Sequence, residues 1–190
     1  MAAARALRAL LAARAVAAGY GVRSTEPRVL QDGVNVVVHL APAPVVARVA
    51  TLTPLLRAGP LRSFAREVAV AGALAAAGAP VVPPSDLLPP GPHRCAGLEL
   101  SFWRDVEVLP VAPSPGEVGA ALAGLHDHLA ALPVTGSPLD TPLDDLTHFL
   151  ALTAVCRLVA GRGLRCRRWR ALRTVCLLVD GSCPGGGELA

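Results

Sequence analysis

The sequence contains no lysine, a single asparagine and few aromatic residues. All 18 positions in its Lys-plus-Arg count are arginine, the asparagine is Asn35, and aromatic residues make up 3% of the 190 residues. This usage is typical of a very GC-rich coding sequence, so an arginine where other proteins have lysine carries little functional meaning. Hydrophobic residues reach 53%, mostly Ala, Val and Leu, and we therefore expect a globular domain packed by small aliphatic side chains.

Long hydrophobic runs are also lacking. Arg, Pro or Gly interrupts every apolar stretch before it reaches the roughly eighteen residues that a membrane span needs, so no membrane partner is expected. Residues 1–22 predict a helix that ends at Gly19 to Gly21. An acid-free, Arg-rich N-terminus also occurs in targeting peptides, but Arg14 breaks the apolar part, which favours an ordinary leading helix.

The five cysteines are odd in number and form no CxxC pair, and no histidine lies at metal-ligand spacing from them. This pattern excludes a typical zinc site and favours free thiols in a reducing compartment. We therefore expect a cytoplasmic protein.

The stretch from Val34 to Pro84 predicts a hairpin followed by a helix. Val34, Val36 and Val38 alternate with other residues, residues 41–44 (APAP) interrupt the run, and residues 45–49 (VVARV) resume it. Apolar residues then recur at helical spacing, with Ser63 as the expected N-cap and Gly78 as the expected stop. Residues 51–62 between the hairpin and the helix are expected to form a linker.

The hairpin carries one charge that needs a partner. Arg48 lies within an apolar strand, and an isolated buried charge costs several kcal/mol. Glu67, near the start of the following helix, is the nearest candidate. We predict an ion pair between Arg48 and Glu67.

Further elements follow along the chain. Val81 and Val82 predict a short strand, and residues 96–110 predict a second strand that runs into a connector. Ser114 and Glu117 form a capping box that starts a helix, and residues 141–144 (TPLD) predict the start of another helix that passes through His148 and Leu150.

Three segments resemble the small lobe of the aminoglycoside phosphotransferase and protein-kinase-like superfamily: VVARVAT, REVAVAGALAAAGAPVVPPSD and LELSFWRDVEVLP. The resemblance covers roughly residues 20–135. The composition of residues 184–190 (PGGGELA) predicts a disordered tail. The resemblance implies an α+β fold, with an antiparallel sheet and one helix at residues 1–110 and a truncated helical lobe at 111–183. It also implies ATP and Mg²⁺ as cofactors, with Arg48 on the nucleotide phosphates and Glu67 oriented toward Arg48.

The resemblance implies roles for two further residues, and each has an ordinary alternative. Gly33 lies where the family has a loop over the nucleotide phosphates, although Asp-Gly is also a common turn. Trp103, with residues 106–109, matches the hinge that holds the adenine ring, but Phe102 and Trp103 are equally consistent with packing at the sheet edge.

The family's catalytic loop, of the type H-G-D-x-H-x-x-N, has no counterpart in these residues. No histidine follows His148, and no asparagine follows Asn35. Asp180 ends an apolar run and superficially matches the family's second metal-binding Asp, but the same segment also matches the closing helix of the family. A deletion or a frame disruption near residue 155 would explain the change in composition.

A cluster of arginines around Trp169 in residues 165–173 favours either phosphate-backbone binding or a solvated helix face, and we adopt the solvated face and expect no nucleic-acid partner. We expect an aminoglycoside phosphotransferase-like protein that is shortened and impaired in phosphoryl transfer to a small-molecule hydroxyl. The alternative is a non-catalytic nucleotide-binding or interaction module.

Overall fold

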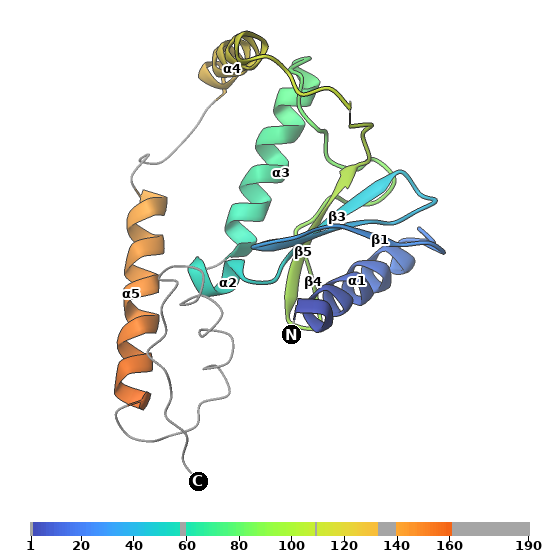
Figure 1. The fold of residues 1–190 in the computed structure, drawn as a ribbon. Helices are drawn as coiled ribbons and strands as arrows, with labels where there is room; N and C mark the ends of the chain where they lie inside the picture. The colour runs from blue at the N-terminus through green and yellow to red at the C-terminus, as the bar shows by residue number, and fades with distance from the viewer. Residues whose placement is uncertain (1, 58–59, 109, 133–139, 161–190) are drawn as a thin grey trace. The chain divides into compact units, whose positions relative to one another are not determined.

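The computed structural model describes residues 2–57, 60–108, 110–132 and 140–160, and these form a five-stranded antiparallel sheet with five helices (Figure 1). The chain divides into two compact units. The sheet unit comprises residues 1–54 and 59–137, and the C-terminal unit comprises residues 55–58 and 138–190. The predicted α+β class is confirmed, whereas the predicted borders at residues 110 and 183 stay predictions.

The sheet has the strand order β1-β2-β3-β5-β4, and every neighbouring pair is antiparallel. The predicted hairpin is confirmed as β2 and β3. The pattern did not predict β1, whose residues are all exposed, or β4, which has three residues. The strands are β1 (Arg28–Asp32), β2 (Asn35–His39), β3 (Val45–Ala50), β4 (His93–Cys95) and β5 (Leu98–Arg104).

The predicted strand at Val81 and Val82 is wrong. The segment meets the sheet through a single isolated bridge between Pro84 and Trp103. Pro83 and Pro84 follow directly and have no N–H to donate to a ladder, so regular pairing cannot extend through them.

The leading helix α1 (Ala2–Gly19) is confirmed, and it covers one face of the sheet (Figure 1). Four small side chains allow the helix to approach the strands closely and bury a continuous core. The helix ends as predicted, because Gly21 has a φ of +82° and the N–H of Val22 donates to the carbonyl of Ala17 at 3.0 Å. The four helix residues in this core are Ala9, Ala12, Ala13 and Ala17.

Helix α3 (Pro60–Ala76) packs on the opposite face of the sheet from α1 (Figure 1). The predicted cap at Ser63 is wrong, since the helix begins three residues earlier at Pro60, whose fixed φ suits the first helical position. The predicted stop at Gly78 is confirmed by its φ of +80°. The segment expected to be only a linker contains the short helix α2 (Thr53–Leu56).

Strand β5 is buried on both faces, although the sequence alternates between apolar and polar residues. Leu100 and Phe102 face the α1 side, while Glu99 and Ser101 are buried on the α3 side. Glu99 accepts a hydrogen bond from Arg94 on β4 at 3.0 Å. The predicted strand at residues 96–110 is therefore confirmed, but it lies inside the sheet between β3 and β4.

Helix α4 (Pro115–Ala130) starts with the predicted capping box. The N–H of Glu117 donates to the Ser114 hydroxyl at 3.3 Å, and the N–H of Ser114 donates to the Glu117 carboxylate at 2.7 Å. Hydrogen bonds from Ser114 to the Glu117 carboxylate, from the Ser114 side chain first and from its backbone second, lower the pKa of Glu117 below its ordinary value. None of the residues described in α4 is buried.

In the C-terminal unit, α5 (Asp140–Ala160) confirms the second predicted helix. It begins at Asp140, so Thr141 lies within the helix and not at its cap, and it continues past Leu150. Arg57 and Asp145 form an ion pair at 3.0 Å inside this unit. No helix in the described part of the chain combines the length and apolar character that a bilayer span requires.

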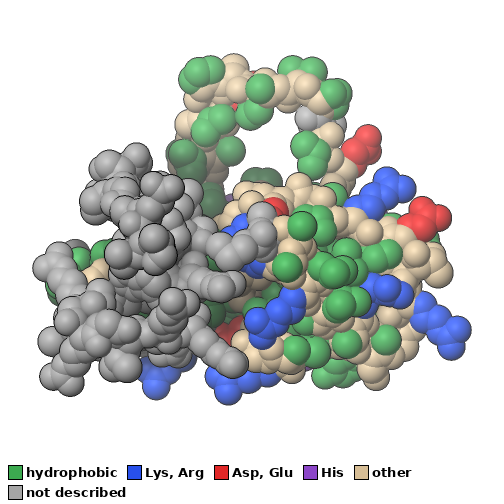
Figure 2. All heavy atoms as spheres, turned by 60° about the horizontal axis from the view of Figure 1, so that its bottom comes forward, with side chains coloured by type: hydrophobic (Ala, Val, Ile, Leu, Met, Phe, Trp, Pro, Cys, Tyr) green, Lys and Arg blue, Asp and Glu red, His purple; other side chains and the backbone are tan. Residues whose placement is uncertain are grey.

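Hydrophobic side chains are also found on the surface of the sheet unit. On the face drawn in Figure 2 they are interspersed with arginine side chains. The more exposed ones in α1 and near β1 are Leu7, Leu11, Tyr20, Val29, Leu30 and Val34.

Candidate functional site

Arg48 lies in the middle of the sheet, on the face opposite α1. It belongs to β3, where its Cα is paired with Val37 of β2 and Ser101 of β5. Strand alternation places Ala47 and Val49 in the α1 core and points Arg48 toward α3. The face of the sheet opposite α1 therefore carries the Arg48 guanidinium beside the hydroxyl-bearing Ser101.

Glu67 of α3 pairs with Arg48, as predicted from the sequence. Nη1 of Arg48 donates to Oε2 of Glu67, and the two side chains are 34% and 33% exposed. The pair is thus only partly withdrawn from water, which differs from the fully buried pair that an apolar strand implies.

The aromatic ring of Phe64 contacts the same guanidinium. It lies one helical turn before Glu67, so both side chains are on one face of α3. The Phe64 ring is 1% exposed, and the Cζ atom of Arg48 lies 5.0 Å from its centroid. This geometry is a cation–π contact, which adds to the ion pair with Glu67.

Asn35 is a third partner of Arg48 that the sequence pattern did not reveal. When the amide is oriented by its hydrogen-bond network, its oxygen accepts from Nε and Nη2 of Arg48 at 3.1 Å each. Asn35 pairs with Ala50, two residues from Arg48, so the two side chains are diagonal neighbours on one face. Asn35 is the only asparagine in the sequence, but its contact with Arg48 depends on the register between β2 and β3, which no local pattern shows.

Two hollows meet at Arg48 and Trp103, and both residues line each of them. The first hollow has a volume of about 390 Å³ and a mostly aliphatic wall. Its other lining residues are Leu30, Val37, Val46, Val82, Arg104, Asp105, Val106 and Val108.

The second hollow lies along α3 and has a volume of about 440 Å³. It contains both members of the ion pair and the guanidinium of Arg66. Its remaining lining residues are Val70, Ala71, Leu74, Trp103 and Leu129. Both hollows thus have mostly apolar walls with a few charged residues, and Arg48 lines both of them.

Trp103 is held in place at the boundary of the two hollows. Its indole N–H donates to the hydroxyl of Ser101 at 2.9 Å, and its Cα is paired with Val46 of β3. The structure therefore brings Trp103 and Arg48 together, as the resemblance implies. Val106 and Val108 line the first hollow, whereas Leu109 lies outside the described residues.

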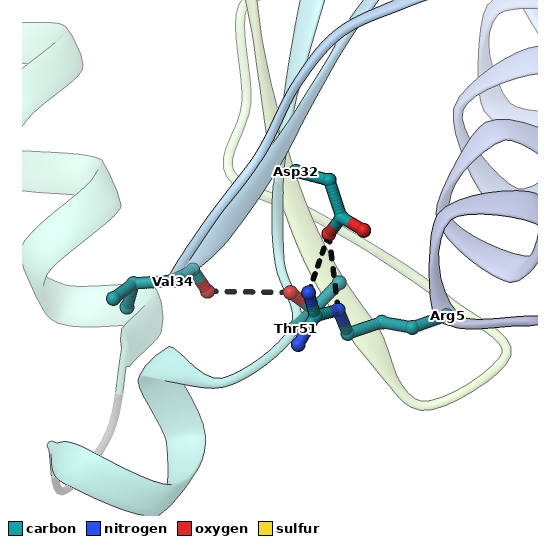
Figure 3. A network of polar contacts seen from close by, with 4 residues as sticks. All are labelled: Arg5, Asp32, Val34 and Thr51. Carbon is teal, nitrogen blue, oxygen red and sulfur yellow. Dashed lines mark hydrogen bonds and ion pairs between the residues drawn. The ribbon is translucent and has the colours of Figure 1, made fainter. Parts of the chain in front are cut away.

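Gly33 lies in the tight turn between β1 and β2, and its N–H donates to the Asn35 carbonyl at 3.0 Å. Figure 3 shows that contacts fix this turn on both sides. Arg5 bonds to Asp32, and the carbonyl of Val34 accepts from the Thr51 hydroxyl at 3.2 Å. Gly33 is not among the residues that line the two hollows at Arg48 and Trp103, so a phosphate-loop role stays a prediction.

The predicted metal residue, Asp180, lies outside the described residues. Within the described ranges, no three His, Cys, Asp or Glu side chains lie close enough together to hold a metal ion. The guanidinium of Arg48 is a group that suits an anion.

No protein-family model matches this sequence, and no curated protein or solved structure is similar enough to be matched to it. The function is therefore argued from the geometry around Arg48.

Proposed function

We propose that the sheet unit binds ATP, and that the chain is an aminoglycoside phosphotransferase-like protein impaired in phosphoryl transfer. The observation that carries this proposal is the ion pair between Arg48 and Glu67, in which Arg48 lines both of the mostly apolar hollows. The resemblance of the sequence assigns Arg48 to the nucleotide phosphates and Glu67 to the orientation of Arg48.

The chemistry of Arg48 supports a phosphate ligand. A guanidinium binds phosphate oxygens through charge-assisted hydrogen bonds, and its positive charge does not depend on pH in the physiological range. Glu67 balances only part of this charge, because Arg66 contributes a second guanidinium to the same hollow. An anion that enters this hollow would therefore encounter a net positive charge.

The first hollow, whose wall is mostly aliphatic, has a size and lining that suit a purine ring next to the phosphates. Ligand sites typically have volumes of about 300–1,000 Å³ and are lined by aliphatic and aromatic groups with a few polar ones. The hollow of about 390 Å³ fits this range, and Val37, Val46 and Trp103 provide flat apolar contact next to Arg48. Adenine is thus expected in this hollow, with the phosphates directed toward Arg48.

Phosphoryl transfer needs groups that Arg48 and Glu67 do not supply. In the resembled family a loop Asp orients the hydroxyl, and an Asn with a second Asp holds magnesium. The printed sequence has no H-G-D segment, and the described residues form no metal cluster. We therefore assign nucleotide binding to this site and expect transfer to be slow.

Calorimetry with ATP and with adenosine tests the proposal. We expect ATP to bind more tightly than adenosine, and we expect Arg48→Ala to lose about tenfold or more in ATP affinity because a charge-assisted contact is removed. Adenosine affinity should change little. The matched control is Arg28→Ala on β1, whose side chain is 70% exposed and lies outside both hollows.

A folded wild-type protein that binds neither ligand would overturn the proposal and favour an interaction module. Equal losses of ATP affinity in Arg48→Ala and Arg28→Ala would show that general surface charge, and not the site, attracts the nucleotide.

A further inference from the structure

The amide of Asn35 contacts the edge of the Arg48 guanidinium that Glu67 leaves open. From this geometry we propose that Asn35 is a positioning residue, which holds Arg48 in the orientation that receives a nucleotide phosphate. The inference rests on the proposed function and adds to it a residue to which the sequence resemblance gives no role.

The hydrogen bonds of Arg48 divide the guanidinium into occupied and open parts. A guanidinium has five N–H donors, of which Glu67 uses one on Nη1 and Asn35 uses two, on Nε and Nη2. Two donors, one on each terminal nitrogen, therefore stay open. These two donors are on the atoms that can bind a phosphate in the two-pronged manner typical of arginine.

Thr53 binds the end of the Asn35 amide that does not face Arg48. The hydroxyl of Thr53 is buried, with 7% of the residue exposed, and it lies 2.6 Å from the amide. With the amide nitrogen directed to Thr53, the oxygen faces Nε and Nη2, and every donor meets an acceptor. The opposite orientation would direct N–H groups against the guanidinium, which has donors only, so Arg48 itself selects this arrangement and the Thr53 hydroxyl accepts from the amide nitrogen.

Three side chains from two elements then restrain Arg48 in different directions. Glu67 and Phe64 come from α3, the first bonded to Nη1 and the second with its ring centroid 5.0 Å from Cζ, while Asn35 comes from β2. Without Asn35 the guanidinium retains Glu67 but can swing about that contact. Ordering it again on ligand binding would reduce the affinity for the phosphate part of the ligand.

The test is the ratio of ATP affinity to adenosine affinity, measured by calorimetry on the full chain. Asn35→Ala should lower this ratio by about three- to tenfold, as expected for the loss of hydrogen bonds to a charged group, and adenosine affinity should be retained. In an Arg48→Ala background, the same substitution should leave the ratio unchanged, because Asn35 acts through Arg48. The matched amide control, Gln31→Ala on β1, should not change the ratio in either background.

Asn35→Thr gives a second route if Asn35→Ala fails to fold. Threonine suits a strand, but its hydroxyl is too short to occupy the position of the amide oxygen, so the ratio should fall in the same way. A wild-type ratio that survives in a folded Asn35 variant would overturn the inference alone. An equal effect of Asn35→Ala with and without Arg48 would also overturn it, whereas a wild-type protein that binds no ATP would overturn the proposed function and this inference together.

Discussion

Arg5 in the leading helix and Asp32 at the end of β1 form an ion pair in which Nε and Nη2 of Arg5 both donate to one carboxylate oxygen, at 3.1 and 2.6 Å (Figure 3). The side chains are 24% and 27% exposed. Asp32 directly precedes Gly33, so this pair attaches α1 to the turn between β1 and β2. Only the tertiary structure brings these two residues together, because 27 positions separate them.

Arg5→Ala should loosen this turn. We expect a loss of about 0.5–1 kcal/mol in unfolding free energy, the upper part of the range for a partly exposed pair. Hydrogen exchange at the Gly33 amide should accelerate by more than the global loss explains. Arg28→Ala is the matched control, since its pair with Glu26 is 3.6 Å long and about 70% exposed on both sides. Equal exchange at Gly33 in the two variants would contradict the attachment.

Glu67→Ala should destabilise the sheet unit by about 1–2 kcal/mol. Breaking a fully buried pair costs about 3–5 kcal/mol, but both side chains here are about one-third exposed, and water replaces part of the lost contact. Chemical unfolding monitored through Trp103 fluorescence measures the loss. Glu67→Gln, which keeps an acceptor, should lose less than Glu67→Ala. A loss of about 4 kcal/mol or more, as expected for a fully buried pair, would show that the pair is more shielded from water than its exposure indicates.

The first turn of α4 should fray in acid. The folded state lowers the pKa of Glu117, so its contribution is complete above the ordinary value of 4.5 and is lost as the pH falls through the lowered folded value. An NMR titration of the amides at Ser114 and Glu117 should show this transition below pH 4.5. Glu117→Gln can still cap the helix but cannot titrate, so its amides should stay unchanged. A transition at the ordinary pKa or above it would contradict the capping contribution.

The chain as printed should not transfer phosphate at a rate typical of the resembled family. General acid–base catalysis alone is commonly worth about a hundred- to ten-thousand-fold, and the loop that supplies it has no counterpart in this sequence. Turnover of ATP against a panel of hydroxylated small molecules measures the rate. This prediction would be overturned by a turnover of about one per second, the lower end of the range for kinases, that Asp180→Ala abolishes. Such a result would place Asp180 in a working metal site.

Local signals in the sequence predicted much of the sheet unit. The alternation in residues 34–49 predicted the hairpin, the Ser114–Glu117 spacing predicted the start of α4, and Gly78 marked the end of α3. Such features depend on residues close in sequence, so their physical causes are visible there. The start of α3 was missed because Pro60 was included in the expected linker at residues 51–62, although proline is equally suited to the first position of a helix.

Other features could not be predicted from local patterns. β1 lacks alternation and is exposed, and β4 is too short to show a period. Glu99 and Ser101 appear as solvent-facing residues in an alternating strand, yet both are buried on the side of the sheet that α3 covers. Burial of a polar strand face depends on which element packs over it, and the sequence of the strand does not show which element that is.

By itself, the sequence determined that Arg48 would need an acidic partner and that Glu67 was within reach, since a charge in an apolar strand requires compensation. The tertiary structure decided how far the pair is exposed, and it added Asn35 and Phe64 as further partners of Arg48. The register between β2 and β3 sets the Asn35 contact, and the rotation of α3 about its axis sets the Phe64 contact. Both depend on the packing of the whole sheet unit, because each aligns residues from elements that no local pattern connects.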